Sequence, residues 1–488
     1  MEHQGRGDEV QSQAPERAER DETSPLLSNA DPDPLLSQPL TGTSELWLLL
    51  EYSLPLIGTY LLQYSFTVVT TLVAGHLSSD DLAATSIGLT TLNLIGLALF
   101  EAMATALDTL CSQSYGSGNY HAVGLHVQRM LLLMGLAIIP IGAVWICSPW
   151  ILPLFVKQDY LVVKAASFLR VSLIGLPGYA SFEALKRFLQ TQGECNAALI
   201  ILVICTPINV GLSWLFAFRL DMGLEGAALG AALTNNIRAI MLVVYIAFLA
   251  KWSHRCWGGF SRRALTNWGP MLRLSFAGSV VNLGEWFAFE AVTLSTSYIS
   301  VEHLAAMAVL TQLCAFMWHI PFSISVAVSI RIGHLIGAGL VSAARRATTL
   351  YAAVFTIVGI FDAVVLFLLR DELPKIISND EYVRSIAAAA MTTLAVFHII
   401  DAISVGASGV LRGLGKQSFA GFVVFPVNYL FAVPLAIWLE LGSPDLKLEG
   451  TWMGLGLGQL VGVVIYCIYL KLMRWQDCVE SAKSREEA

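Results

Sequence analysis

The chain has 488 residues, of which 56% are hydrophobic and 13% are charged, and its formal net charge is −7. Its mean hydropathy is +0.65. Soluble domains carry roughly 25% charged residues, and a soluble fold of this size could not bury so much apolar surface. The composition therefore excludes an ordinary soluble or nucleic-acid-binding protein. It predicts a chain that crosses a bilayer repeatedly, because each helical span needs about 20 apolar residues.

Residues 1–44 are the first predicted segment, and they are rich in Asp, Glu, Pro, Ser and Gln with almost no aromatic residues. Such a composition cannot bury enough apolar surface to fold, so it predicts a disordered tail. The segment lacks the basic region and apolar core of a cleaved signal peptide, and we expect it to stay in the cytosol. It contains two acidic dileucine patterns: Glu22 with Leu26 and Leu27, and Asp31 with Leu35 and Leu36.

Short targeting motifs act as addresses that receptors read, and cytosolic sorting adaptors read the acidic dileucine form. Two copies in one tail favour residence in the vacuolar or lysosomal membrane. The alternative is that leucine pairs near acids arise by chance in a tail of this composition. The plasma membrane would then be the expected location.

Twelve apolar stretches follow the tail, and each is long enough to cross a bilayer as a helix. We predict spans at residues 46–73, 82–108, 130–155, 161–184, 197–218, 224–250, 271–299, 304–330, 347–369, 382–411, 418–439 and 450–473.

The orientation of these spans follows from their loops. With the N-terminal tail inside, the loops on the cytosolic side carry roughly twice as many Lys and Arg residues as the loops opposite. Short cytosolic loops of membrane proteins are enriched in these residues. We therefore expect both termini in the cytosol.

The chain matches itself at an offset of about 222 residues, which indicates an internal repeat. The matched segments occur in the same order in both halves: Leu82-Ala83-Ala84 with Leu304-Ala305-Ala306, Gly116-Ser117-Gly118 with Gly337-Ala338-Gly339, Arg187 and Gln192 with Arg412 and Gln417, Pro207-Ile208-Asn209 with Pro426-Val427-Asn428, and Leu224-Glu225-Gly226 with Leu448-Glu449-Gly450.

Each half holds an even number of spans, so the two copies are parallel repeats, an arrangement suited to alternating access. The predicted fold class is an all-α polytopic membrane protein with twelve transmembrane helices in two pseudo-symmetric six-helix lobes. We expect these parts: the tail, an N-lobe at 45–250, a cytosolic linker at 251–270, a C-lobe at 271–475 and a cytosolic C-terminal tail at 476–488.

Several motifs make the chain resemble the multidrug and toxin extrusion (MATE) family, and its fungal members most of all. The resemblance covers roughly residues 45–475 and rests on these segments: Ala106–Gly116, Leu185–Gly193, Gly284–Glu290, Ser329–Gly339 and Gly409–Gln417. It implies two six-helix bundles in a V shape. It also implies exchange of H⁺ or Na⁺ for organic, often cationic, compounds, and here we expect H⁺ rather than Na⁺.

Other functions remain as alternatives. A major-facilitator transporter also has six plus six helices, but its basic motif after the second helix is missing from Gly116–Gly124. A lipid or conjugated-metabolite transporter of the same superfamily fits the same pattern. A membrane-embedded enzyme would need polar catalytic clusters or long loops, which the sequence lacks. We therefore expect no enzymatic activity, no metal and no cofactor, and a monomer surrounded by lipid.

Ionisable side chains within a span are costly and mark functional sites. Glu285, Glu290 and Asp401 are the strongest candidates. A carboxyl group in a partly dry cavity can take a proton near physiological pH because water no longer stabilises its charged form. Proton and cationic substrate would then compete for one site. Glu285 and Glu290 lie about 140° apart around a helix, so we expect one to line the cavity and the other to pack against a neighbouring helix.

Further polar and aromatic residues complete the predicted site. Trp286 offers a cation–π surface, and Asn93 is a polar residue within the second span. The resemblance adds Gln63, which matches a glutamine of animal members and falls opposite Glu285 under the repeat. It also adds Gln312, at a position where some members carry an acid. We assign structural roles to Asp108, Glu183, Arg170 and Arg238, and we expect the two arginines to pair with acids or backbone carbonyls in the bundle interior.

Overall fold

The computed structural model describes residues 41–487 other than 155 and 157, and every regular element within them is helical. Both acidic dileucine patterns, and all but the last residues of the predicted N-terminal tail, lie outside these residues.

Six long helical segments make up the first half. They are α2 (Gly42–Leu77); α3 (Ser79–Leu92) continued by the π-helical η1 (Asn93–Leu97) and α4 (Ala98–Gly116); α5 (Tyr120–Ile146); α7 (Asp159–Ser172) continued by η3 (Leu173–Gly175) and α8 (Leu176–Thr191); α9 (Asn196–Trp214) with η4 (Leu215–Arg219); and α10 (Gly223–Val244) with η5 (Tyr245–Leu249).

Six more long segments make up the second half. They are α11 (Gly269–Thr296); α12 (Val301–Gly337); α13 (Val341–Leu368); α15 (Glu381–Gly413); α16 (Gln417–Pro426) continued by η8 (Val427–Ala432) and α17 (Val433–Leu441); and α18 (Lys447–Leu472). Shorter helices connect them or follow them: α6 (Ser148–Ile151), η2 (Leu152–Leu154), η6 (Lys251–Cys256), η7 (Arg262–Leu265), α14 (Leu373–Ile377) and α19 (Gln476–Glu487).

Each predicted span therefore falls on one long helical segment. Among the described residues, eleven of these segments are long and apolar enough to cross a membrane. The remaining long helix, α11, carries Arg273, Glu285 and Glu290 and does not reach the same apolar composition. It nevertheless packs along α4 and α16 within the bundle. The all-helical, polytopic fold class is confirmed.

The contacts between the halves follow the repeat. The offset of the repeat pairs α2 with α11, and the α3–α4 segment with α12. The contact of α2 with α12 and the contact of α11 with α4 are thus equivalent under the repeat. Helix α4 also packs directly against α12. The α4–α12 crossing accordingly lies on the pseudo-symmetry axis.

Local backbone features recur at the same offset. Ser78 caps α3 by accepting a hydrogen bond from the backbone N–H of Asp81, and Ser300 caps α12 in the same way through His303. Ser and Thr favour such positions because their hydroxyl oxygen satisfies an unpaired N–H of the first turn. The left-handed glycines after α8 and after α15, Gly193 and Gly415, also recur, because only glycine adopts this conformation without strain.

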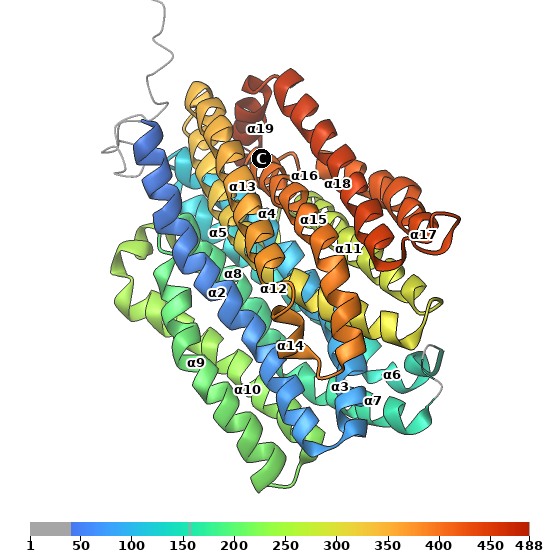
Figure 1. Ribbon diagram of the computed structural model, residues 1–488. Helices are drawn as coiled ribbons and strands as arrows, with labels where there is room; N and C mark the ends of the chain where they lie inside the picture. The colour runs from blue at the N-terminus through green and yellow to red at the C-terminus, as the bar shows by residue number, and fades with distance from the viewer. Residues whose placement is uncertain (1–40, 155, 157, 488) are drawn as a thin grey trace, which may run out of the picture.

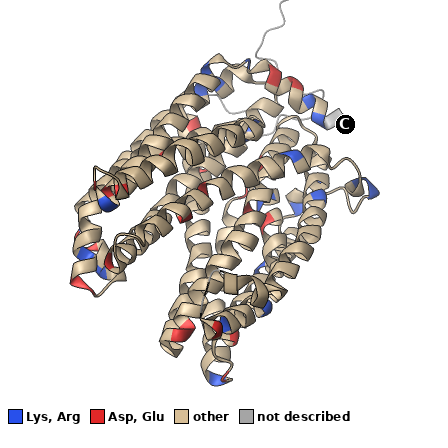
Figure 2. Ribbon diagram, turned by 90° about the vertical axis from the view of Figure 1, so that its right-hand side faces the viewer, with Lys and Arg blue, Asp and Glu red and all other residues tan. Residues whose placement is uncertain are grey.

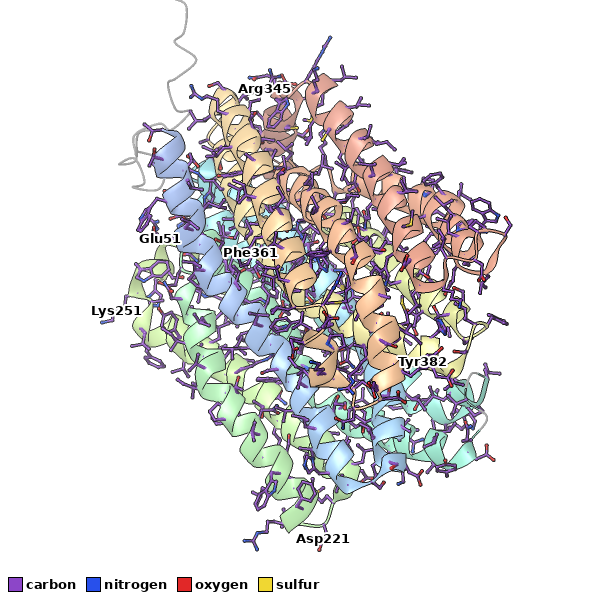
Figure 3. The ribbon with its side chains drawn as sticks, viewed as in Figure 1. Glu51, Asp221, Lys251, Arg345, Phe361 and Tyr382 are labelled. Carbon is purple, nitrogen blue, oxygen red and sulfur yellow. The ribbon has the colours of Figure 1, made fainter. Side chains whose placement is uncertain are left out.

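The helices form two groups that are close together at one end and diverge toward the other (Figures 1 and 2). The N-terminal end of α2 and helix α19 lie at the close end (Figure 1), which we call the terminal face. Arg345 marks this face, and Asp221 marks the opposite face (Figure 3).

The linker and the C-terminal segment both have regular structure. The linker forms η6 and η7, and it docks on α5 through a hydrogen bond of 2.8 Å from the Gln128 side-chain amide to the carbonyl oxygen of Gly259. Helix α19 packs against α12 and α4. Its buried Cys478 and Val479 belong to a core cluster that also contains α12 residues.

Candidate functional site

A cavity of about 290 Å³ lies between the two halves. Its walls come from α2, the α3–η1–α4 segment, α5, the α7–η3–α8 segment and α10 of the first half and from α11, α12, α15 and α18 of the second. Along α2 it extends from Tyr60 to Thr70, toward the end of the helix that lies far from the terminal face. It therefore lies where the two groups of helices diverge (Figure 2).

The second half supplies the three predicted acids. Glu285, Glu290 and Asp401 all line the cavity. The expectation that only one glutamate of α11 would face it is wrong. The cavity takes in a wide arc of α11, from Asn282 to Thr293, so residues about 140° apart both reach it.

Asp401 is the most enclosed of the three, with 4% of its surface exposed. Its Oδ2 atom has no hydrogen-bond partner within the described residues. Two further polar residues lie buried in this half without partners for their polar atoms, Asp362 on α13 and His398 on α15. Sequence analysis missed both, although an acid within the apolar segment 347–369 was a visible signal for Asp362.

The first half contributes a hydrogen-bonded network around Gln63. Its amide nitrogen donates to the Tyr179 hydroxyl at 3.1 Å and to the Glu183 carboxylate at 2.9 Å. Its carbonyl oxygen accepts from Lys186 at 3.2 Å, and Lys186 forms a buried ion pair with Glu183 at 2.8 Å. Gln63 thus lines the cavity and joins this ion pair in one hydrogen-bonded network.

Asn93 and Glu101 line the cavity just before and just after the π-helical turn η1. A single π-helical turn inside an α-helix frequently marks a functional site. Here it sets the register in which Asn93, Leu97 and Glu101 reach the same cavity.

Gln312 does not take part in the site. It is exposed on α12 and is absent from the residues that line the cavity, whereas its neighbour Thr311 lines it. The expectation that Gln312 belongs to the binding site is therefore wrong, because the helix turns this side chain to another face. The aromatic residues divide similarly: Trp286, Phe289 and Trp318 line the cavity, and Phe287 does not.

Arg238 of α10 also lines the cavity. Its guanidinium group stacks on Phe66, Tyr179 and Phe182, with 5.4, 4.9 and 4.6 Å to the ring centroids. The prediction of pairing with an acid or a carbonyl is wrong: no ion pair joins it within the described residues, and its Nε and Nη2 atoms lack hydrogen-bond partners.

The structural role predicted for the remaining charges takes a definite form. Asp108 and Arg187 form an ion pair of 3.0 Å with almost no exposed surface. Arg331 of α12 pairs with Glu45 of α2, with 3.0 Å between Nε and Oε2, and the Tyr351 hydroxyl donates to the same carboxylate at 3.1 Å. These pairs lie between the cavity and the terminal face.

Small residues close the terminal side of the cavity at the α4–α12 crossing. A Cβ atom at Gly116 would overlap the carbonyl oxygen of His334, and one at Gly337 would overlap that of Gln113. These two contacts are related by the repeat. Hydrogen bonds between the halves add to the closure, including 2.8 Å from the Gln113 amide to the carbonyl oxygen of Gly413.

Comparison with known proteins gives the family. The MatE family model matches the chain twice, over residues 55–215 and 279–438. An uncharacterized transporter of Schizosaccharomyces pombe is 38% identical over 443 residues, which are 90% of this chain and 81% of that protein. Multidrug and toxin extrusion protein 2 of Mus musculus is 29% identical over 433 residues, which are 88% of this chain and 75% of that protein.

Among solved structures, the crystal structure of the eukaryotic MATE transporter AtDTX14 superposes with a TM-score of 0.86 at 24% identity, covering 91% of this chain and 99% of that one. Two repeated groups of helices around one cavity, together with these relatives, define a polytopic membrane transporter. The chain belongs to the MatE family, the multidrug and toxin extrusion transporters.

Proposed function

We propose that the protein is a proton-coupled antiporter that moves organic, mainly cationic, compounds out of the cytosol by alternating access. The observation that carries the proposal is the cavity between the two repeated halves, in which Glu285, Glu290 and Asp401 lie beside aromatic rings. An ionised carboxylate attracts an organic cation, and a neutral carboxyl group does not. A proton and a cation that compete for these acids would be exchanged rather than carried together.

The aromatic residues suit the same class of substrate. Trp286 and Phe289 are on the helix that carries two of the acids, and Trp318 faces the cavity from α12. The face of an aromatic ring attracts a cation, most strongly in a site shielded from water. A cavity with several aromatic rings would accept cations of different shapes.

The closed terminal side supports an alternating-access cycle. The glycine contacts of α4 with α12 shut the cavity from the terminal face, and the helices diverge toward the opposite face. Rocking of the two halves about this crossing would open the other side in turn. We further propose that the terminal face is cytosolic, that the protein resides in a vacuolar membrane, and that it loads substrate into the acidic lumen.

Purified protein in liposomes tests the proposal. An outward proton gradient, with the liposome interior acidic, should drive uptake of a fluorescent organic cation, whereas the reverse pH gradient, or an equal Na⁺ gradient without a pH difference, should not. Uptake driven by Na⁺ alone would overturn proton coupling. Gradient-independent movement of labelled phospholipid, without cation uptake, would point to a lipid transporter instead.

A further inference from the structure

Arg238 is a buried cation in the wall of the cavity. Only 1% of its surface is exposed, and the residue nevertheless lines the cavity. Three aromatic rings contact its guanidinium group. The rings contact the flat face of the guanidinium group, but its N–H groups point outward in the plane and need hydrogen-bond acceptors.

Two buried acids of the first half are paired with other cations, and a third, Glu101, lines the cavity without an ion pair in the described residues. Glu183 is bonded to Lys186 and Gln63, and Asp108 is paired with Arg187. No acid forms an ion pair with Arg238 within the described part of the chain, and two of its three guanidinium nitrogens lack any hydrogen-bond acceptor. Removing a charge from water without a partner is costly, so such a group at membrane depth marks a functional position.

The repeat-related helix of the second half carries no cation at the position of this arginine. Under the repeat, Gly226 of α10 corresponds to Gly450 of α18, and the same spacing places Gly462 opposite Arg238. Asn235 and Gln459, which also correspond, both line the cavity. The second half thus builds the equivalent helix without a cation, and the three acids Glu285, Glu290 and Asp401 lie in that half.

We infer that Arg238 binds an anionic group of the substrate, a carboxylate or a sulfonate, while the acids of the second half hold its cationic part. The inference rests on the proposed function and narrows its substrate class. The preferred substrates are then aromatic zwitterions and organic acids that also carry a positive group. A guanidinium group in the cavity wall is suited to a charged hydrogen bond with a carboxylate.

A matched pair of dyes tests this inference through binding alone. Rhodamine B carries a carboxylate beside its cationic ring system, and its ethyl ester carries only the cation. Fluorescence anisotropy with purified protein should show tighter binding of rhodamine B than of the ester. Arg238→Gln should weaken rhodamine B binding about tenfold or more, as expected for a lost charged hydrogen bond, and should leave ester binding unchanged or tighter. Arg238→Lys should retain part of the preference.

The control variant is Arg219→Gln. Arg219 also stacks on an aromatic ring, that of Trp214, but it is exposed and does not line the cavity. This variant should bind both dyes like the wild type. Equal losses for both dyes in Arg238→Gln would assign a structural role to the arginine and overturn the inference.

A second measurement does not depend on folding of the variants. Benzenesulfonate added to the wild-type protein should weaken binding of rhodamine B by a larger factor than binding of the ester, and equal effects would contradict the inference.

Uptake into liposomes distinguishes failure of this inference from failure of the proposed function. Proton-driven uptake of the ester without a preference for rhodamine B in binding would overturn the anion site alone. Arg238-dependent binding without proton-driven uptake would overturn the coupling alone.

Discussion

At the scale of single residues, the most informative feature is the contrast between charged groups around the cavity that form ion pairs and those that do not. Glu183 and Lys186 form a closed network with Gln63. Asp401, in contrast, keeps one carboxylate oxygen without a partner. An ion-paired group stabilises the bundle, whereas an unpaired one at the cavity is free to bind a proton or a ligand.

The first prediction concerns the acids of the second half. Asp401→Asn and Glu285→Gln should each abolish uptake driven by a pH gradient in liposomes, because a neutral amide cannot exchange a proton for a cation. Folding should be little affected, since neither carboxylate takes part in an ion pair within the described residues. Glu290→Gln should give a smaller loss, because Glu290 is exposed while the other two are enclosed.

The control for this prediction is Glu381→Gln, which removes an exposed acid at the start of α15, the helix that also carries Asp401. It should transport like the wild type. Wild-type uptake rates in both Asp401→Asn and Glu285→Gln would contradict the role of the acids.

The second prediction concerns the buried ion pair of Asp108 and Arg187, in which both side chains are almost fully enclosed. Asp108→Asn should lower the free energy of unfolding by roughly 3–5 kcal/mol, because it leaves an uncompensated buried charge. Adding Arg187→Met should recover part of this loss, because the double variant buries no charge. Thermal unfolding in detergent measures both changes, and a double variant that loses the sum of the two single losses would contradict direct coupling.

Sequence patterns identified part of the site and missed part of it for physical reasons. An acid inside an apolar span is conspicuous, so Glu285, Glu290 and Asp401 were predicted to belong to the site, and all three line the cavity. Whether a side chain faces the cavity depends on the rotation of its helix, so Gln312 was wrongly included. The lack of an ion-pair partner for Arg238 could not be predicted from the sequence, because it depends on how the neighbouring acids pair in the folded protein.

At the scale of elements, each predicted span falls on one long helical segment, eleven of which are apolar enough to cross a membrane, but some predicted spans are too short on the terminal side. The second and eighth spans were expected to end near Asp108 and Arg331, where charge interrupts the apolar pattern. Helices α4 and α12 instead continue to Gly116 and Gly337. Both charges are neutralised by buried partners, and pairing of this kind is not visible in a hydropathy profile.

The third prediction concerns the crossing of α4 with α12. Gly116→Ala should place a methyl group against the His334 carbonyl. Because the opposing atom is backbone, it cannot move aside as a side chain would. Overpacking of this kind costs roughly 1–3 kcal/mol, and we expect a lower unfolding temperature together with slower transport.

Gly135→Ala provides the matched control. Gly135 is a helical glycine of α5 with open space where a Cβ atom would lie. Alanine favours a helix by up to about 1 kcal/mol over glycine, so this variant should be at least as stable as the wild type. Equal behaviour of the two variants would show that the crossing is not tightly packed.

At the scale of the whole molecule, the two halves share a fold but differ in charge. The contacts of α2 with α12 and of α11 with α4 repeat one geometry, which suits rocking about the axis between the halves. The cavity between them is asymmetric, with Arg238 and one acid, Glu101, in the first half and three acids, Glu285, Glu290 and Asp401, in the second. The repeated helix contacts thus suit the rocking motion, and the unequal charges of the two halves suit the selection of substrate.

The last prediction concerns the location of the molecule in the cell, which decides whether transport means sequestration or export. The two dileucine patterns, Leu26-Leu27 and Leu35-Leu36 with their preceding acids, lie outside the described residues. The described chain begins at the terminal face, where α2 starts (Figure 1). If that face is cytosolic, the segment before it is within reach of cytosolic adaptors.

Changing all four leucines to alanine should move a fluorescent fusion protein from the vacuolar to the plasma membrane, as seen by microscopy. Gln11 and Gln13, which belong to neither pattern, provide the control: their change to alanine should leave the location unaltered. A quadruple variant that still reaches the vacuole would place the signal elsewhere in the chain. A wild-type protein at the cell surface would make the molecule an export pump, because substrate would then leave the cell instead of entering an acidic lumen.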